Sequence, residues 1–186
     1  MPGATKLLTS GGGAVTIQPA SSIASDVTVQ VPSVAGTVLL KESSSGMQVP
    51  AFSAYLPSPQ NVSSGTPTKV ALSAEEFDTA NCFDSTTNYR FTPNVAGYYQ
   101  VTFTVGGNSS STALVASIYK NGSTWKQSIW AASAGTGVSI SLPVMAIMYM
   151  NGTTDYIEFY GQTNGGTQLY GAQNYTFAMA ALVRAA

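Results

Sequence analysis

The sequence F-T-P-N-V-A-G-Y-Y-Q-V-T-F at residues 91–103 decides how the rest of the chain is interpreted. It opens with a turn, in which Pro93 fixes φ, Asn94 tolerates a left-handed conformation and Gly97 adopts one freely. After the turn, apolar and polar residues alternate, which is the period of a strand with one buried face and one wet face. The stretch therefore predicts an antiparallel strand together with its entry turn.

From residue 49 onward, the sequence consists of short apolar segments separated by turns. The expected strands cover residues 51–56, 69–72, 99–105, 113–119, 124–131, 138–142, 144–150, 155–160, 168–170 and 175–183, with Pro143 as a break. Asn-Gly pairs at 121–122 and 151–152 mark turns, and the first favours a type I′ hairpin. No segment has helical periodicity. Nine or ten short strands with regularly spaced turns are typical of a sandwich or jelly roll.

Several of these segments resemble C1q-like domains, the trimeric jelly rolls related to tumour necrosis factor. The central signature of that family is matched by Phe91, Gly97, Tyr99 and Phe103, although Val101 stands where phenylalanine is usual. Three more segments follow in the family's order: P-A-F-S-A-Y at 50–55 with Phe52, N-G-T-T-D-Y-I-E-F at 151–159, and Y-T-F-A-M-A-A-L-V at 175–183 with Phe177. The resemblance covers residues 49–184. It implies an all-β, ten-strand-type jelly roll that forms a homotrimer, but the fold hosts many functions.

Residues 1–46 differ from the rest because they contain no aromatic residue and are rich in Gly, Ser and Val. Apolar alternation at 14–18, 26–31 and 37–40 predicts two or three strands, which bury too little surface to fold alone. The segment is similar to the attachment ends of bacteriophage fibre and decoration proteins; a flexible leader is the alternative. A polar stretch at 41–48 marks the boundary. We therefore expect an attachment module with its linker at 1–46 and the jelly roll at 47–186.

Composition excludes several classes of function. Charged residues make up 8% of the chain and the net charge is −1, so no basic field is present to hold nucleic acid. The longest apolar run, 144–150, is too short to span a membrane, and the first residues lack the apolar core of a secretory signal. With no histidine, catalytic triads and most zinc sites are excluded. The single cysteine, Cys82, is expected to be a small buried filler.

The remaining candidate site residues are acidic or aromatic, and each group also has an ordinary structural explanation. The carboxylates Glu75, Glu76 and Asp78 are close in sequence, which is typical of a solvated turn. Some C1q-like domains bind calcium through loop oxygens, so the resemblance makes Asp78 and Asp84 the candidate ligands, but no EF-hand spacing is present and no cofactor or metal is expected. The aromatic candidates for a sugar-binding surface are Trp125, Trp130, Tyr160 and Tyr170, with core or interface packing as the alternative.

The run V-M-A-I-M-Y-M at 144–150 is apolar at every position. One face of such a strand meets the core, and the other face needs a cover. We expect that cover to be a neighbouring subunit, with loops of the same chain as the alternative. The predicted trimer seam consists of Val144, Ala146, Met148 and Met150.

These observations together predict a non-enzymatic structural protein of a bacteriophage virion. The favoured role is a trimeric capsid decoration (cement) protein or head fibre, whose partner is the major capsid protein or another virion protein. A trimer matches a capsid threefold site because closed oligomers bind best where symmetry agrees. The alternative is the receptor-binding tip of a tail fibre, with loops 58–68 or 161–166 contacting a host glycan. An enzyme would need a carboxylate pair that the sequence does not offer.

Overall fold

The structure is a computed structural model that describes residues 5–8, 14–17, 49–108, 112–131 and 139–186. The described residues form strands and turns, and none of them is helical. The chain divides into two compact units, Met1–Lys41 and Glu42–Ala186. The predicted domain boundary at 46/47 lies outside the described residues and stays a prediction.

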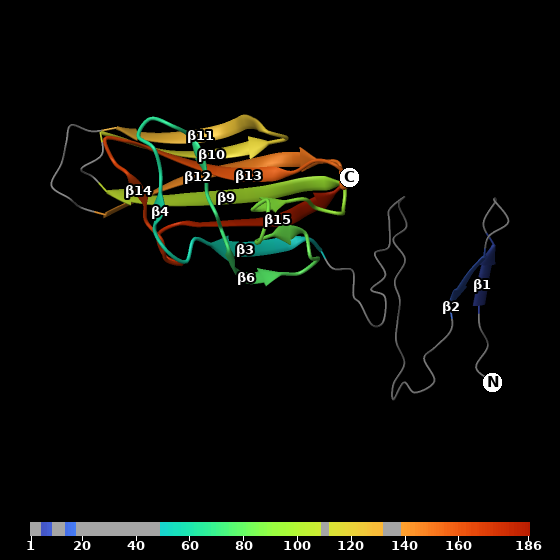
Figure 1. Cartoon of the computed structure of the whole chain (residues 1–186). Helices are drawn as coiled ribbons and strands as arrows, with labels where there is room; N and C mark the ends of the chain where they lie inside the picture. The colour runs from blue at the N-terminus through green and yellow to red at the C-terminus, as the bar shows by residue number, and fades with distance from the viewer. Residues whose placement is uncertain (1–4, 9–13, 18–48, 109–111, 132–138) are drawn as a thin grey trace. The chain divides into compact units, whose positions relative to one another are not determined.

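The described residues of the first unit form an antiparallel strand pair, β1 (Thr5–Leu8) with β2 (Ala14–Ile17) (Figure 1). The strand predicted at 14–18 is present as β2. The strand β1 was not predicted, because T-K-L-L has no apolar alternation. The strands predicted at 26–31 and 37–40 lie outside the described residues.

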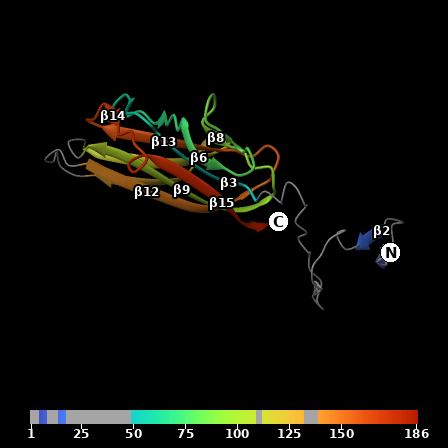
Figure 2. The same ribbon diagram turned by 90° about the horizontal axis from the view of Figure 1, so that it is seen from below.

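The second unit is a sandwich of two antiparallel sheets. The five-stranded sheet has the order β12 (Ser139–Met150), β9 (Gly97–Asn108), β15 (Phe177–Ala185), β3 (Ala51–Tyr55) and β6 (Ala74–Asp78). The six-stranded sheet has the order β11 (Ser123–Ala131), β10 (Ala113–Lys120), β13 (Ile157–Asn164), β8 (Arg90–Phe91) and β7 (Phe83–Asp84), with β5 (Thr68–Lys69) also paired to β13. A short ladder joins β4 (Gln60–Asn61) to β14 (Gln168–Leu169). Figure 2 shows β12, β9 and β15 side by side in one layer.

The core between the sheets is a cluster of aromatic rings. Phe52 stacks on Phe83 at 4.4 Å and on Phe91 at 4.8 Å between ring centroids. Phe103 packs on Phe159 at 5.3 Å. Among the predicted signature residues, Phe52, Phe91, Tyr99 and Phe103 are fully buried, whereas Phe177 is half-buried in β15. The signature therefore places four of its aromatic residues in one core.

Gly97 has a physical reason to be glycine. A Cβ at this position would lie 2.4 Å from the carbonyl oxygen of Arg184, where β9 and β15 approach each other. Two residues further on, the hydroxyl of Tyr99 donates to the carbonyl of Val95 at 2.7 Å and ties the entry turn to the strand. The spacing between Gly97 and Tyr99 thus fixes how the turn enters the sheet.

Replacing Gly97 by alanine should destabilise the jelly roll, because the new methyl group forces β9 and β15 apart. Overpacking of this kind costs about 2–3 kcal/mol. Thermal unfolding followed by circular dichroism should show a clear decrease in melting temperature. Gln127→Ala, an exposed substitution on β11, serves as the control and should melt like the wild type. An unchanged melting temperature for Gly97→Ala would contradict the close approach of the two strands.

The prediction that Pro143 breaks the strand was wrong. β12 runs without interruption from Ser139 to Met150, and Pro143 lies opposite Thr104 of β9. Within the described sheets β12 pairs only with β9, so it is an edge strand. An edge strand tolerates proline because the missing amide hydrogen can fall on the free side of the ladder. The two strands predicted at 138–142 and 144–150 are therefore one continuous strand.

Candidate functional site

The outer face of the five-stranded sheet is an unusually apolar surface. Strand registers place Met145, Thr102, Met179, Ser53 and Phe77 in one row that crosses all five strands. The face contains seven of the ten large hydrophobic side chains that are exposed among the residues the structure describes: Phe77, Tyr98, Met145, Ile147, Tyr149, Met179 and Val183. We call these seven residues the apolar face. Contiguous exposed patches of this kind mark interaction sites more often than free surface.

Two of these side chains are largely exposed to solvent, so they contribute little to packing in the core. Met145 and Ile147 on β12 are each 65% exposed. Further along the same strand, the ring of Tyr149 packs edge-on against Tyr98 of β9, with centroids 5.6 Å apart. A groove of about 290 Å³ crosses the face between β9, β15, β3 and β6, and Met179 and Phe77 lie in its wall. The face therefore offers both projecting and concave apolar surface.

Charged groups are nearly absent from four of the five strands of this sheet, and the acidic residues of the sheet lie on the edge strand β6. The four adjacent strands β12, β9, β15 and β3 contain one charged residue, Arg184, near the end of β15. At the β6 edge, the carboxylate of Glu76 accepts hydrogen bonds from the hydroxyl of Ser53 and the side-chain amide of Gln173. The Ser53 bond, with a smaller contribution from Gln173, lowers the pKa of Glu76. The negative charge therefore stays at the border of the apolar face.

Comparison with known proteins gave structural matches only: no family model matches the chain, and no curated protein matches it. The globular domain of zebrafish complement 1qA protein matches with a TM-score of 0.57 and 16% identity, over 74% of this chain and 99% of that one. Eiger TNF from S. frugiperda matches with a TM-score of 0.54 and 12% identity, over 74% and 95%. The fold is that of the C1q/TNF-like jelly rolls. PRD1 vertex protein P5 has it too, with a TM-score of 0.52 and 18% identity over 75% of this chain and 100% of that one.

This C1q/TNF-like sandwich corrects the predicted trimer seam. Val144, Ala146, Met148 and Met150 are all buried within the chain itself, where they face the core. Their register sets them beside core residues of β9, with Val144 opposite Phe103. The prediction was wrong about the side of the strand: both alternating sets are apolar, so the sequence does not distinguish them. The alternate residues of β12 that remain exposed to solvent are Met145, Ile147 and Tyr149.

The jelly roll does not gather the four aromatic residues that were candidates for a sugar-binding surface. Trp125 on β11 is 49% exposed and lies 5.7 Å from the Lys120 ammonium group. The other three have partners within the protein: Trp130 packs against the core, Tyr160 stacks on Tyr119 at 4.0 Å, and Tyr170 packs edge-on against Tyr175. They therefore form no common platform.

The carboxylates that were candidate calcium ligands instead hold loops of the jelly roll in place. Asp78 accepts hydrogen bonds from the backbone amides of Phe83 at 2.7 Å and Ala80 at 3.2 Å. Asp84 accepts from the amides of Thr86, Thr87 and Asn88, from the Thr86 hydroxyl and from the Asn88 side chain. No group of three or more His, Cys, Asp or Glu residues suited to a metal occurs in the described part of the chain. In the same part, no helix is long and apolar enough to cross a membrane.

The hydrogen bonds to Asp84 predict an acid-dependent contribution to stability. They hold the pKa of Asp84 well below its usual range, with the amide of Thr87 as the largest cause. A depressed folded-state pKa stabilises the protein above the unfolded value of about 3.9, and this stabilisation is lost as the pH falls further. Asp84→Asn should therefore lower the melting temperature at pH 7 and flatten its decrease below about pH 4. A variant with the wild-type pH profile would contradict this role.

Proposed function

We propose that this chain is a non-enzymatic structural protein of a bacteriophage virion and that it assembles as a homotrimer through the apolar face. The observation that carries the proposal is the apolar face itself, which crosses the sheet and contains one charged residue in the four strands β12, β9, β15 and β3. Burial of apolar area is the main favourable term in protein association. A nearly charge-free surface avoids the penalty for burying unpaired charges. In this proposal the apolar face therefore forms the contacts between subunits.

The fold supports three copies rather than another number. The sequence resembles C1q-like domains, which are trimeric jelly rolls, and the second unit has their fold. A ring of three identical subunits closes on itself and leaves no unsatisfied copy of the interface. In this proposal, Met145, Ile147 and Tyr149 replace the even-numbered residues of β12 as the seam.

The proposed location is the virion, and the favoured role is decoration of the capsid. PRD1 vertex protein P5 shares the fold, which supports a place on a viral particle. Residues 1–46 resemble attachment segments of bacteriophage fibre and decoration proteins, which assigns the first unit to docking on the major capsid protein or another virion protein. A trimer on a capsid threefold site would clamp adjacent capsid subunits and oppose the internal pressure of the DNA.

Copy number and heat stability of purified particles test the decoration role. A decoration protein should be present in hundreds of copies, and particles that lack it should release DNA at a lower temperature. Adding back the full chain should restore heat stability, whereas a chain that begins at Met47 should not. A few tens of copies, together with inhibition of infection by free protein, would instead indicate the receptor-binding tip of a tail fibre.

A further inference from the structure

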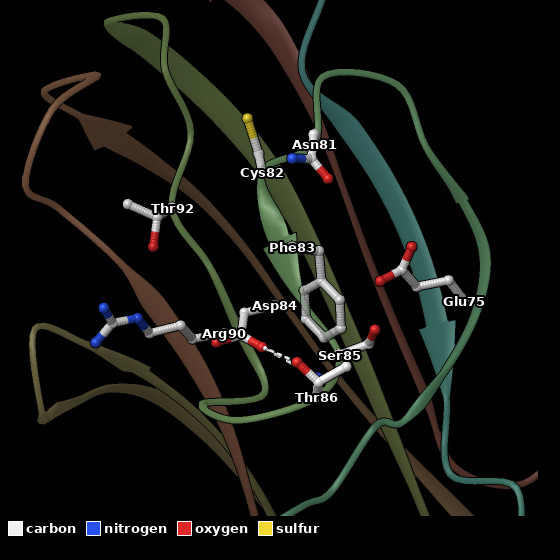
Figure 3. A pocket seen from close by; sticks show the side chains of 9 residues that line it. All are labelled: Glu75, Asn81, Cys82, Phe83, Asp84, Ser85, Thr86, Arg90 and Thr92. Atoms are coloured by element: carbon white, nitrogen blue, oxygen red, sulfur yellow. Dashed lines mark hydrogen bonds between the residues drawn. The ribbon is translucent and has the colours of Figure 1, made fainter.

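A second concave surface lies where the edges of the two sheets meet. It is a pocket of about 530 Å³ between β6 of the five-stranded sheet and β7 of the six-stranded sheet (Figure 3). Its size falls within the range of about 300–1,000 Å³ typical of small-molecule sites. It shares no lining residue with the groove of the apolar face, so the proposed trimer contact does not account for it.

The walls of this pocket are held in place by hydrogen bonds to two carboxylates. The carboxylate of Asp78 fixes residues 80–83 through two backbone amides, and that of Asp84 fixes residues 86–88 through three. The two walls are joined by a hydrogen bond of 2.7 Å from the amide of Thr92 to the carbonyl of Cys82. The pocket is therefore formed before any ligand arrives, which reduces the entropy lost on binding.

Backbone strain is concentrated in the same loops. Asn81 has a φ of 52° and Tyr89 a φ of 48°. Asparagine tolerates this region, but a bulky residue such as tyrosine adopts it only when the surrounding structure demands it. Strained residues of this kind cluster at ligand sites. Both positions belong to the two loops that border the pocket.

Several polar side chains in the pocket have no hydrogen-bonding partner among the described residues. They come from both sheets and the loops between them: Glu75, Asn81, Ser85, Arg90 and Thr92. Figure 3 shows Glu75 on one side of the pocket and Arg90 on the other. The guanidinium of Arg90 lies 4.7 Å above the ring of Tyr156, which positions it while its N–H donors stay available. The pocket therefore presents hydrogen-bond donors and acceptors together.

We infer that this pocket binds a neutral saccharide. Neighbouring sugar hydroxyls both donate and accept, which suits a carboxylate, a guanidinium, an amide and two hydroxyl side chains arranged around one cavity. Glu75 and Asp84 would repel a phosphate, while one guanidinium opposite Glu75 disfavours a small cation. Phe83, the only aromatic residue of the lining, is buried against Phe52 and offers no open face for stacking a nucleobase. Hydrogen bonding without an aromatic platform implies weak binding, with Kd on the order of 1 mM.

Cys82 makes the inference testable, because it is the single cysteine of the sequence and lies in the pocket wall. The full chain is treated with a thiol reagent in the presence of methyl glycosides of glucose, galactose, mannose, rhamnose and N-acetylglucosamine. Burial raises the pKa of the Cys82 thiol, so the reaction is run at alkaline pH. At about 50 mM, far above the expected Kd, at least one glycoside should slow the reaction more than about twofold. The same glycoside should give saturation-transfer NMR signals from bound sugar.

Variants separate pocket binding from non-specific effects. Arg90→Gln and Glu75→Gln should both abolish protection of Cys82 and the transfer signals, and Ser85→Trp should do so by filling the pocket. Gln127→Ala on β11, at the opposite edge of the six-stranded sheet, should behave like the wild type. Protection by a purified host polysaccharide at far lower concentration would identify a glycan rather than a free sugar as the source.

Three results would overturn the inference. The first is the absence of transfer signals for every glycoside, whatever the rate of the thiol reaction. The second is binding that persists unchanged in Arg90→Gln and Glu75→Gln. The third is protection of Cys82 by inorganic phosphate when no glycoside protects it. None of these results bears on the trimer, because the test does not involve the apolar face.

Discussion

Replacing Ile147 by lysine should abolish the trimer while leaving the jelly roll folded. Ile147 is 65% exposed on β12 within the apolar face, so a lysine there stays hydrated in the separate chain. Exposed substitutions usually change folding stability by less than about 0.5 kcal/mol. In the trimer the same ammonium group would be buried without a partner, which costs about 3–5 kcal/mol and weakens association more than a hundredfold. Light scattering measures the loss of the trimer, and circular dichroism checks the fold.

Ile129→Lys is the matched control. Ile129 on β11 is 59% exposed, but it belongs to the six-stranded sheet, away from the apolar face. The two variants add the same charge to a similarly exposed isoleucine, and only Ile147→Lys should dissociate the protein. A trimer that tolerates Ile147→Lys would remove the apolar face from the interface.

Replacing Phe52 by alanine should have the largest effect on folding. Phe52 is fully buried and contacts Phe83, Phe91 and Phe159, so it joins β3 of one sheet to three strands of the other. Truncating a buried phenylalanine costs about 3–5 kcal/mol through lost transfer free energy and the cavity left behind. Urea unfolding in the Ile147→Lys background, in which no trimer is expected, measures this loss in the separate subunit.

Phe77→Ala in the same background provides the comparison. Phe77 lies on β6, next to β3, but is 49% exposed, so its truncation should cost less than about 1 kcal/mol. Equal losses for the two phenylalanines would contradict the position of Phe52 at the centre of the core.

The parts of the fold that could be predicted are those encoded by local pattern. Short apolar segments bounded by turns, with clear alternation in the central two, predicted the strands that became β3, β9, β10, β11 and β15. The Asn-Gly pair at 121–122 predicted a hairpin with two positive φ angles, which are 51° and 78°. These features are determined by residues that are close together in the sequence, so a single sequence is sufficient to predict them.

The features that were missed depend on contacts between distant segments. β6 contains three charges in five residues and pairs with β3 through an irregular register, so its sequence carries no strand period. The open side of β12 follows from its pairing with β9, which local pattern does not encode. The pocket between β6 and β7 depends on Asp78 and Asp84 bonding to backbone amides. From sequence, Asp78 was interpreted as part of a solvated turn, and the resemblance made both residues candidate calcium ligands, so their bonds to backbone amides were not predicted.

Solution mass by light scattering, for the full chain and for a chain that begins at Met47, tests the central claim most directly. We predict a mass three times 19.2 kDa for the full chain and a trimer that persists after truncation, because the apolar face lies entirely within the second unit. A monomer in both forms would contradict the trimer, and with it the symmetry argument for a capsid site. A trimer only in the full chain would place the contact in residues 1–46 and leave the apolar face unexplained.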